Sequence, residues 1–333
     1  MRILLIGPYP PPHGGVSVHV SGLQRQLTAA GLRCEVLNTN RIRLGLGFGI
    51  LLLRHAWQGW TLHLHTNGHN WRSWLLAMGC GLAGQASGGC ILTLHSGMSP
   101  AYLGAASVWR RGLASLTCLL YTRVICVSPG IRKALISLGV PCQRSEVVPA
   151  CLKTERPQVA LEPLLRAWMG RHQPLFSTAL FFRPEYGFDL LVAGLALLRG
   201  RHPSFGCLVM GSGEQREEAE RRIHELGLEE NILIVGDVAH DVCLTLMSMS
   251  QVFIRPTLAD GDSISVREAL SLGVPVVASR VGTRPDGVLL FQPGDADEMV
   301  SQIELALAAE TGGEAPAAGC MDRLLDIYRK VAA

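Results

Sequence analysis

Acidic residues are scarce in the first half of this chain. Residues 1–150 contain thirteen Lys or Arg residues and only two acids, Glu35 and Glu146, which gives a net charge of +11. Residues 151–333 contain seventeen Lys or Arg residues and twenty-five acids, which gives −8, and the halves together account for the +3 of the whole chain. So sharp a change predicts a domain boundary near residue 150. It also predicts an anionic partner for the first half, such as a membrane surface, a diphosphate lipid or a nucleic acid.

Lysine is scarce as well, since Lys133 is the only one in the first half and the arginines there are dispersed. No nucleic-acid-binding motif accompanies them, so we expect no nucleic-acid partner. An ordinary basic surface would give the same charge. That simpler interpretation stays open beside a membrane surface or a diphosphate lipid.

Paired cysteine motifs and long apolar runs are also missing. The ten cysteines include no Cys-x-x-Cys pair, which favours free thiols in a reducing cytoplasm over disulfides or a zinc site. The apolar run at residues 3–6 is too short for a signal peptide or a membrane span. Residues 73–109 contain no Asp, Glu, Lys or Arg, but glycines and Pro100 interrupt them, so we expect a strand–helix core there.

What the chain does contain is a regular alternation of apolar strands and helical segments. With 333 residues, of which 48% are hydrophobic, it is long enough for two domains. We expect strands at residues 2–6, 34–37, 61–64, 91–94, 124–127, 175–182, 207–210, 232–235, 252–254, 276–278 and 289–291. We expect helices at residues 16–30, 45–57, 71–82, 105–121, 130–138, 188–198, 215–226, 263–272, 298–309 and 320–331, with a linker at 155–174. This order predicts an α/β fold with doubly wound parallel sheets.

The stretch between the strands at 252–254 and 276–278 carries the strongest chemical signal. Its loop holds Asp260 and Asp262 and leads into a helix that begins near Ser263 and contains Ser265 and Glu268. Unpaired N–H groups at a helix N-terminus bind diphosphate, and serine hydroxyls add donors. A carboxylate one or two turns into the helix accepts both hydroxyls of a ribose. A capping role would explain Asp262 or Ser263, but it leaves Glu268 unexplained.

The pattern Asp260-x7-Glu268, followed by Ala-Leu-x-x-Gly-x-Pro, resembles the acid-x7-acid signature of retaining glycosyltransferases of the GT-B fold, family four. The usual form there is Glu-x7-Glu. The resemblance implies two facing Rossmann-like doubly wound domains with a central cleft. The implied domains are a basic acceptor-binding domain at 1–155, a nucleotide-sugar-binding domain at 172–318 and a closing helix at 319–333. Glu268 would hold the ribose, and Asp260 would stabilise positive charge at the anomeric carbon of the transferred sugar.

Two loops of the first half fit the same resemblance. Gly14-Gly15 follows the first strand, where such enzymes have a Gly-Gly loop near the donor diphosphate, although a simple Pro/Gly turn would look the same. His95 ends a strand at the position where related enzymes often carry a histidine that reaches the sugar or the acceptor. A structural histidine is the alternative. His65 and His69 are weaker candidates, and their spacing permits a metal, but no carboxylate is near and we expect none.

Three loops of the second half complete the implied donor site. The stretch Phe181-Phe-Arg-Pro-Glu-Tyr-Gly187 resembles the family's Arg-x-x-Pro-x-Lys-Gly loop, whose two cations clamp the diphosphate. Phe181 and Tyr186 replace those cations, so Arg183 is expected to supply one charge. Arg255 or Arg284 would supply another, unless they are ordinary surface arginines. The loops at Gly211 and Val238 resemble the segments that face the donor and recognise the base.

These observations predict a retaining glycosyltransferase that needs no metal and uses a UDP- or GDP-linked sugar. The basic first half and the Arg41–Arg54 segment favour docking on the anionic inner face of the plasma membrane, where the enzyme would reach a lipid-linked or glycan acceptor. The pathway expected is bacterial surface polysaccharide synthesis. One alternative is a catalytically weak subunit or pseudoenzyme that supports a partner transferase. Another is a different GT-B enzyme, such as a nucleotide-sugar epimerase or a phosphorylase.

Overall fold

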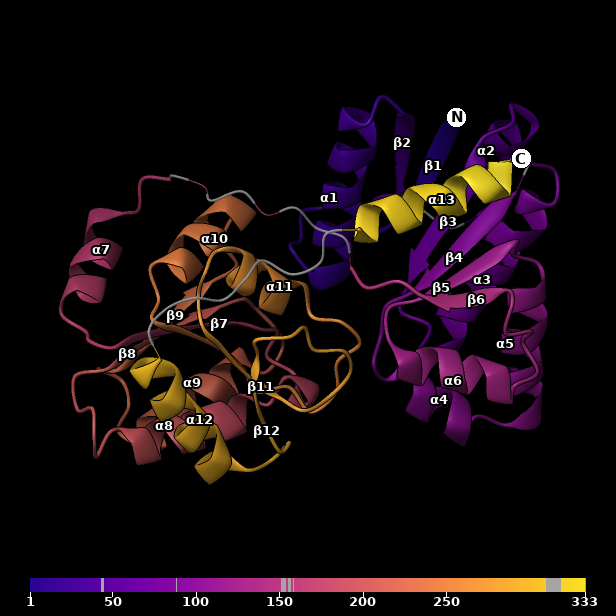
Figure 1. Ribbon diagram of the computed structural model, residues 1–333. Coiled ribbons are helices and arrows are strands. Elements are labelled where there is room, and N and C mark those ends of the chain that lie inside the picture. The colour runs from indigo at the N-terminus through magenta and orange to yellow at the C-terminus, as the bar shows by residue number, and fades with distance from the viewer. Residues whose placement is uncertain are drawn as a thin grey trace. The chain divides into compact units, whose positions relative to one another are not determined.

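The computed structural model describes residues 1–42, 45–87, 89–150, 154, 157, 159–309 and 319–332. The chain divides into two compact units (Figure 1). Residues 1–153, 260–264 and 317–333 form the first unit, and residues 154–259 and 265–316 form the second. The segment 260–264 therefore belongs to the first unit, although its neighbours in sequence belong to the second. The domain boundaries expected at 155 and 318 fall on residues outside those described.

The first unit contains a six-stranded parallel sheet in the order β2-β1-β3-β4-β5-β6. Its strands are β1 (Arg2–Gly7), β2 (Arg33–Asn38), β3 (Thr61–Thr66), β4 (Cys90–Leu94), β5 (Arg123–Cys126) and β6 (Ser145–Val147). The first five confirm the predicted strands. The three-residue β6 was not predicted, because its sequence Ser-Glu-Val carries no apolar run.

Helices cover both faces of this sheet, so its central strands are buried on both sides. They are α1 (Gly15–Ala29), α2 (Leu46–Trp57), α3 (Trp71–Gly84), α4 (Ser99–Ala105), α5 (Val108–Leu119), α6 (Pro129–Ser137) and α13 (Cys320–Ala332). Along β1, Leu4 and Ile6 pack in the cluster that includes α2, α3, α5 and α6. Ile3 and Leu5 pack in the cluster of α1 and α13. The period of two along a strand explains this division.

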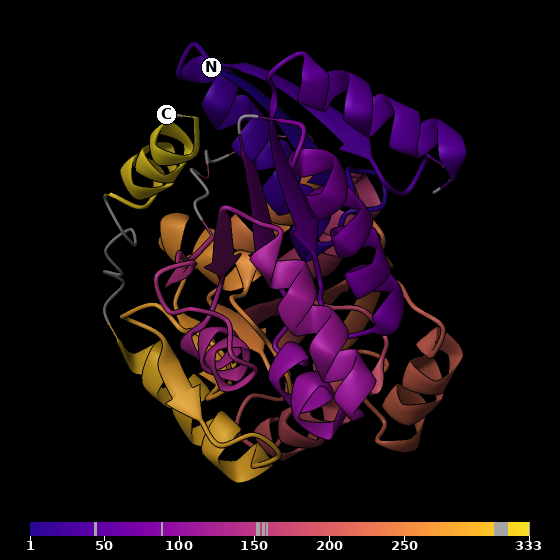
Figure 2. The same ribbon diagram turned by 90° about the vertical axis from the view of Figure 1, so that its right-hand side faces the viewer.

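The C-terminal helix α13 returns to the first unit and lies along its sheet (Figures 1 and 2). The Tyr328 hydroxyl lies 2.5 Å from His63 Nδ1, and His63 Nε2 lies 2.7 Å from Thr93 Oγ1. These contacts tie α13 to β3 and β4 inside a buried region.

The second unit repeats the architecture with a six-stranded parallel sheet in the order β12-β11-β10-β7-β8-β9. Its strands are β7 (Leu175–Ala179), β8 (Gly206–Met210), β9 (Ile232–Gly236), β10 (Val252–Arg255), β11 (Val276–Ser279) and β12 (Leu289–Phe291). Its helices are α7 (Pro163–Gly170), the 3-10 helix η1 (Pro184–Tyr186), α8 (Phe188–Leu198), α9 (Arg216–Glu225), α10 (His240–Ser248), α11 (Ile264–Ser271) and α12 (Ala296–Ala308). Side chains of α8, α9 and α12 bury one face, and those of α7, α10 and α11 bury the other.

Three element predictions were wrong in part. The helix expected at 105–121 is α5, which begins only at Val108 because Ala106 and Ser107 have extended backbone angles, and α4 before it was not predicted. The linker expected at 155–174 contains α7, which begins at Pro163 and buries Met169. Helix α10 was not predicted, although His240 begins it directly after the β9 loop.

The cysteine prediction holds for eight residues and is wrong for one. Eight cysteines are free thiols, most of them buried in the two sheets and their helices. Cys320, at the start of α13, is disulfide-bonded, so the expectation of free thiols throughout is corrected there. Among the described residues, no helix is both long and apolar enough to cross a membrane.

Candidate functional site

The carboxyl ends of the strands in the second sheet carry most of the predicted donor-binding residues. Because all neighbouring strands are parallel, their carboxyl ends lie at one edge, where open α/β sheets bind ligands. Arg183 follows β7, Gly211 follows β8 and Val238 follows β9. Arg255 is the last residue of β10, and α11 with Glu268 begins after the next loop. The structure therefore brings residues from four strands to the edge that the sequence predicted.

Glu268 is a buried carboxylate with one identified partner. Its side chain is on α11, and only 4% of the residue is exposed. Glu268 Oε1 lies 2.7 Å from Nε2 of His240, the first residue of α10. A buried carboxylate needs such a partner. The contact fixes the direction of the carboxylate, and His240 was missed because it lies 28 residues away in sequence.

Arg255 lies beside Tyr186, which stands at the usual lysine position of the family pattern. Its guanidinium lies 5.1 Å from the ring centroid of Tyr186, the residue in the usual lysine position. Arg255 is only 8% exposed, and its Nη1 donates a hydrogen bond of 2.6 Å to the Ala179 carbonyl. Burial beside an aromatic ring and a carbonyl holds this guanidinium in one place.

Arg183 and Arg284 are arranged differently. Arg183 is exposed, and its guanidinium lies 5.8 Å from the centroid of Phe181. The Arg284 guanidinium donates to the Ser279 carbonyl at 3.1 Å and to Thr257 Oγ1 at 3.3 Å, between the ends of β10 and β11. Of these three arginines at the second sheet edge, Arg183 is exposed, Arg284 is partly buried and Arg255 is buried.

Gly211 brings backbone close to backbone at this edge. It has a φ of 138°, and a Cβ there would overlap the Leu180 carbonyl oxygen. Only glycine fits such a position without strain. The tight approach of the β8 loop to the β7 loop, more than any contact of Gly211 with a ligand, accounts for the glycine.

The loop 260–264 packs within the first unit. A Cβ on Gly97 would overlap the Asp260 carbonyl, and a Cβ on Gly261 would overlap the His95 carbonyl. Asp262 Oδ2 accepts a hydrogen bond of 2.6 Å from the Ala150 N–H. The backbones of Asp260 and His95, the two predicted catalytic residues, therefore lie side by side. Asp262 holds this loop through Ala150.

The serines and glycines of the two predicted phosphate loops lie at helix starts. Ser263 directly precedes α11 and is buried, and Ser265 is on its first turn and partly exposed. Gly14 precedes α1 with extended backbone, and its N–H donates to Ser17 Oγ at 2.9 Å. Gly15 is the first residue of α1. The Gly14 N–H is thus already used in capping α1.

His95 belongs to a cluster of imidazoles at the carboxyl edge of the first sheet. His95 Nε2 lies 3.0 Å from His65 Nδ1 at the end of β3, and the ring of His19 from α1 lies 5.0 Å from that of His95. His63 stacks against His65 with ring centroids 4.1 Å apart. His63 and His65 share a face because they alternate along β3, and α1 brings His19 to that face. Alternation was the signal that would have found the pair, whereas His19 needs the helix packing.

Three members of the cluster, His63, His65 and His95, are uncharged at neutral pH. Burial and, to a lesser extent, the neighbouring His19 together lower the pKa of His63 to about 3. Burial and the adjacent imidazoles also hold the pKa values of His65 and His95 well below the usual histidine value. Neutral imidazoles donate or accept single hydrogen bonds, which suits sugar hydroxyls.

Three imidazoles of this cluster are the best candidate metal ligands among the described residues. One nitrogen from each of His19, His65 and His95 lies within 4.8 Å of the other two. His65 Nε2 is buried without a hydrogen-bond partner. His69, which the sequence also suggested, is outside this group, so the cluster differs from the pair considered from spacing.

Two family models match the chain. Residues 172–309 match the model of "Glycosyl transferases group 1", and residues 40–156 match "Glycosyltransferase Family 4". A GDP-mannose-dependent alpha-(1-6)-phosphatidylinositol monomannoside mannosyltransferase of Mycolicibacterium smegmatis is 29% identical over 175 residues, 49% of this chain and 45% of that protein. The gpi3 subunit of phosphatidylinositol N-acetylglucosaminyltransferase of Schizosaccharomyces pombe is 24% identical over 190 residues, 56% of this chain and 40% of that protein. The matched region thus spans less than half the length of these curated relatives.

Solved structures resemble the chain over its whole length. HepE of Anabaena, in a complex with UDP-glucose, has a TM-score of 0.71 at 17% identity and covers 100% of this chain and 98% of its own. An alpha,alpha-trehalose-phosphate synthase of Burkholderia vietnamiensis has a TM-score of 0.72 at 14% identity and covers 100% and 97%. These matches confirm the predicted GT-B fold class. With matches to the two family models in the two halves of the sequence, the chain belongs to the glycosyl transferases of group 1, family 4.

Proposed function

We propose that this protein is a retaining glycosyltransferase that moves a sugar from a UDP- or GDP-linked donor to a lipid-linked acceptor. The observation that carries the proposal is the buried Glu268, held by His240 at 2.7 Å on the helix that follows the acid-x7-acid loop. Its fixed carboxylate accepts the ribose hydroxyls of the donor. Arg255, over Tyr186, supplies the charge that the family pattern places there and stabilises the departing diphosphate.

The remaining predicted residues take roles around this anchor. The start of α11 with Ser263 and Ser265, together with Arg183, receives the diphosphate, and the Gly14–Gly15 loop is a further diphosphate contact that the sequence resemblance implies. Gly211 and Val238 border the donor at the strand ends. The neutral His95 donates a hydrogen bond to the transferred sugar, and Asp260 stabilises positive charge at its anomeric carbon. Asp has one carbon fewer than the usual Glu, so Asp260 acts over a greater distance.

The donor site is tested by calorimetric titration of the protein with UDP, GDP and ADP. We expect one nucleotide to bind and Glu268→Ala to weaken that binding by about 100-fold, because two hydrogen bonds to a charged group are lost. Glu217→Ala removes an exposed carboxylate from α9 of the same unit and serves as the matched control. Binding that survives Glu268→Ala unchanged would refute this assignment.

Transfer itself is tested by the product. Incubation with the donor that binds and with lipid extracted from the host membrane should give a glycolipid whose anomeric configuration, read by NMR, matches that of the donor. Turnover of the donor into another nucleotide sugar without an acceptor would favour an epimerase. Nucleotide binding without any product would favour a catalytically weak subunit of a partner transferase. Activity should persist in EDTA, and loss of activity that a transition metal restores would contradict the metal-free mechanism and point to His19, His65 and His95.

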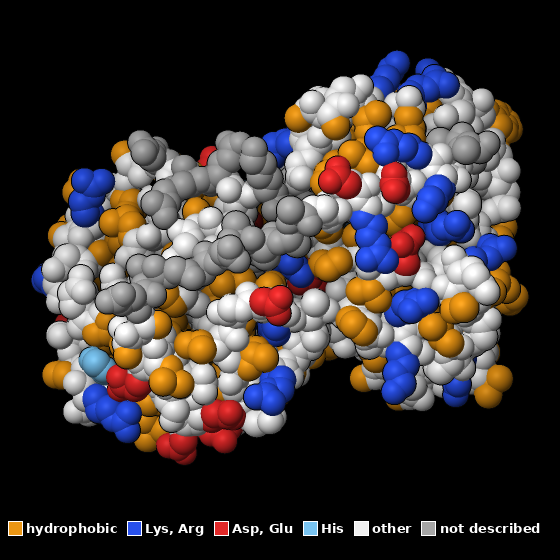
Figure 3. Space-filling view, viewed as in Figure 1, with side chains coloured by type: hydrophobic (Ala, Val, Ile, Leu, Met, Phe, Trp, Pro, Cys, Tyr) orange, Lys and Arg blue, Asp and Glu red, His pale blue; other side chains and the backbone are white. Residues whose placement is uncertain are grey.

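The membrane is the proposed location of the acceptor. The first 150 residues carry +11, and Figure 3 shows Lys and Arg side chains spread over the visible face of the first unit. The Arg41–Arg54 segment contains α2, although Arg43 lies outside the described residues. We expect co-sedimentation with phosphatidylglycerol vesicles that salt reverses, and none with phosphatidylcholine vesicles. Equal binding to both, or to neither, would refute docking on the cytoplasmic face. Surface polysaccharide synthesis is the pathway this location favours.

A further inference from the structure

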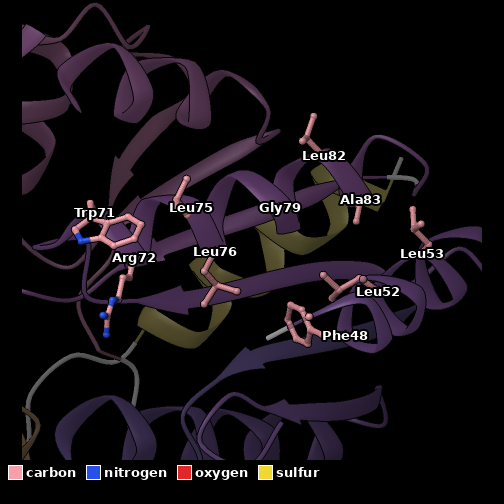
Figure 4. A pocket seen from close by; sticks show the side chains of 12 residues that line it. Phe48, Leu52, Leu53, Trp71, Arg72, Leu75, Leu76, Gly79, Leu82 and Ala83 are labelled. Carbon is pink, nitrogen blue, oxygen red and sulfur yellow. The ribbon is translucent and has the colours of Figure 1, made fainter. Parts of the chain in front are cut away.

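Helices α2 and α3 of the first unit enclose a pocket that the proposed catalytic residues do not use. Its volume is about 630 Å³, and twelve residues line it. Phe48 and Leu52 of α2 and Ala83 of α3 form the buried floor, with 7%, 2% and 6% of each residue exposed. Figure 4 shows Leu76 and Phe48 between the two ends of the pocket, with Trp71 and Arg72 at one end and Leu53 and Leu82 at the other. The pocket is therefore elongated along the helices.

The rim is apolar but open to solvent. Trp71, Leu75, Leu82 and Leu53 are 45%, 42%, 56% and 38% exposed. Large apolar side chains gathered around a concave site, instead of being scattered singly, mark a binding surface. The exposed apolar side chains of the rim therefore favour an apolar ligand.

Two glycines contribute to the depth of the pocket. Gly49 of α2 and Gly79 of α3 both line it, and a Cβ added to either would meet nothing within 4 Å. Neither glycine has a positive φ, so no backbone demand accounts for them. Both lie in helices, where glycine is disfavoured relative to alanine. Open space over the helix surface is what these two glycines provide.

The polar chemistry of the pocket is confined to one end. Among the described residues that line the pocket, Arg72 is the only one with a charged side chain. It is on the first turn of α3, and the four residues 67–70 connect that helix to the end of β3, where His65 lies. The Arg72 end of the pocket therefore faces the edge of the sheet that carries the histidine cluster. Residues 36–145 contain no Asp or Glu, so no carboxylate of that stretch competes with a bound anion for Arg72.

We propose that this pocket holds one hydrocarbon chain of the acceptor lipid, with its phosphate at Arg72 and its glycan at the edge of the sheet near His95. This rests on the proposed function in one respect, namely that the acceptor is lipid-linked. A peptide is a poorer occupant, because its backbone amides would find no hydrogen-bond partner along a lining of carbon atoms. A hydrocarbon chain needs none, and the guanidinium pairs with the one charged group that follows it.

The chain site is tested by calorimetry on the full chain with hexadecyl phosphate, below its micelle concentration and without nucleotide. We expect saturable binding. In a series of shorter alkyl phosphates, each added methylene should tighten binding by up to about fourfold until the pocket is filled. No binding, or affinity independent of chain length, would overturn the proposal.

Gly79→Leu separates insertion into the pocket from adhesion to an apolar surface. The new side chain fills the pocket, and it meets no existing atom at its Cβ. Binding of hexadecyl phosphate should weaken by roughly tenfold or more, as two or more methylenes lose their contacts. Gly112→Leu is the matched control, because Gly112 is exposed in the middle of α5 and also has nothing within 4 Å. It should change binding by less than about twofold. Binding to Gly79→Leu that equals or exceeds wild type would mean surface adhesion and refute the pocket.

Two further measurements distinguish failure of the lipid-chain site from failure of the proposed function. Arg72→Gln should weaken hexadecyl phosphate while leaving the affinity for hexadecanol unchanged, and equal loss for both would refute the phosphate contact. Gly79→Leu should lower kcat/KM for the lipid-linked acceptor but not the affinity for the donor nucleotide. If the nucleotide fails to bind wild type while the alkyl phosphates bind as expected, the proposed function fails and the chain site stands. The reverse pattern removes the chain site alone.

Discussion

The two sheets share one topology class but present opposite chemistry at their carboxyl edges. The second sheet edge carries Arg183, Arg255 and Arg284 beside the buried Glu268–His240 pair. The first sheet edge carries imidazoles whose pKa values are held low by burial, so they are neutral. Parallel sheets offer the same edge in both cases, and the side chains after each strand decide what binds. Charge suits a diphosphate nucleotide, whereas neutral donors and an apolar pocket suit sugar hydroxyls and a lipid.

The largest effect that would test this contrast comes from the guanidinium groups of the second sheet edge. Arg255→Met should lower kcat by about 100- to 1,000-fold, because a fixed cation that stabilises the leaving diphosphate is removed. Arg255→Lys should restore part of the rate, since it keeps the charge without the planar fork. Steady-state kinetics measure both, with circular dichroism melting to show that each variant is folded. An unchanged kcat in Arg255→Met would move the catalytic charge to Arg183 or Arg284.

The first sheet edge should affect turnover without affecting nucleotide binding. His95→Ala should lower kcat by about 10- to 100-fold. This is the expected cost of losing one hydrogen bond to the transferred sugar, on which charge develops in the transition state. The dissociation constant of the nucleotide, measured by calorimetry, should stay as in wild type. A His95→Ala variant that loses both nucleotide binding and turnover would show that the first sheet edge also contributes to nucleotide binding.

The neutral histidines also predict how stability depends on pH. The pKa of His63 in the folded state is lowered to about 3, whereas an unfolded histidine titrates near 6.5. The unfolded state therefore binds more protons between these values. The stability from the neutral form is complete above about pH 6.5 and falls as pH decreases toward 3, by about 1.4 kcal/mol per pH unit for each such histidine.

Urea unfolding at pH 7, 6 and 5 measures this slope. His63→Asn should reduce the slope by the share of one histidine, although it also removes the contacts to Tyr328 and Thr93. The comparison therefore uses the slope against pH and not the stability at one pH. An identical slope in wild type and variant would show that His63 is not held neutral.

The smallest expected effect concerns the missing lysine of the family pattern. Tyr186→Lys should change kcat/KM by less than about fivefold, because Arg255 already places a guanidinium over that position and a further, partly exposed charge adds little. A large gain in activity would instead support the catalytically weak subunit, whose defect the lysine repairs. Steady-state kinetics with the natural donor decide between the two.

Much of the fold was readable from apolar runs alone. Strands such as β1 and β4 are continuous apolar segments because helices bury both of their faces, so period and composition predicted them. The short β6 and helix α7 were missed. The first has no apolar run, and the second follows a proline-rich stretch that resembles a linker.

For the candidate site, too, local sequence patterns predicted some residues and left their interaction partners unidentified. Local patterns predicted Gly211 and His95 directly after strands, Arg183 in the loop after β7 and Glu268 within the first turns of a helix, and the structure places them there. Their partners lie far away in sequence: His240 for Glu268, Tyr186 under Arg255, and His65 with His19 for His95. No periodicity links such pairs.

By itself, the sequence determined the class of the fold, the strand ends at which the candidate site residues lie, and the unequal charge of its two halves. These follow from strand period, chain order and composition, which act locally along the chain. Tertiary structure alone decided that β3 and α1 gather histidines into one cluster and that α10 orients Glu268. It also decided that α2 and α3 leave a pocket over their glycines. Burial and hydrogen bonding between distant segments set those properties, and both exist only once the chain has folded.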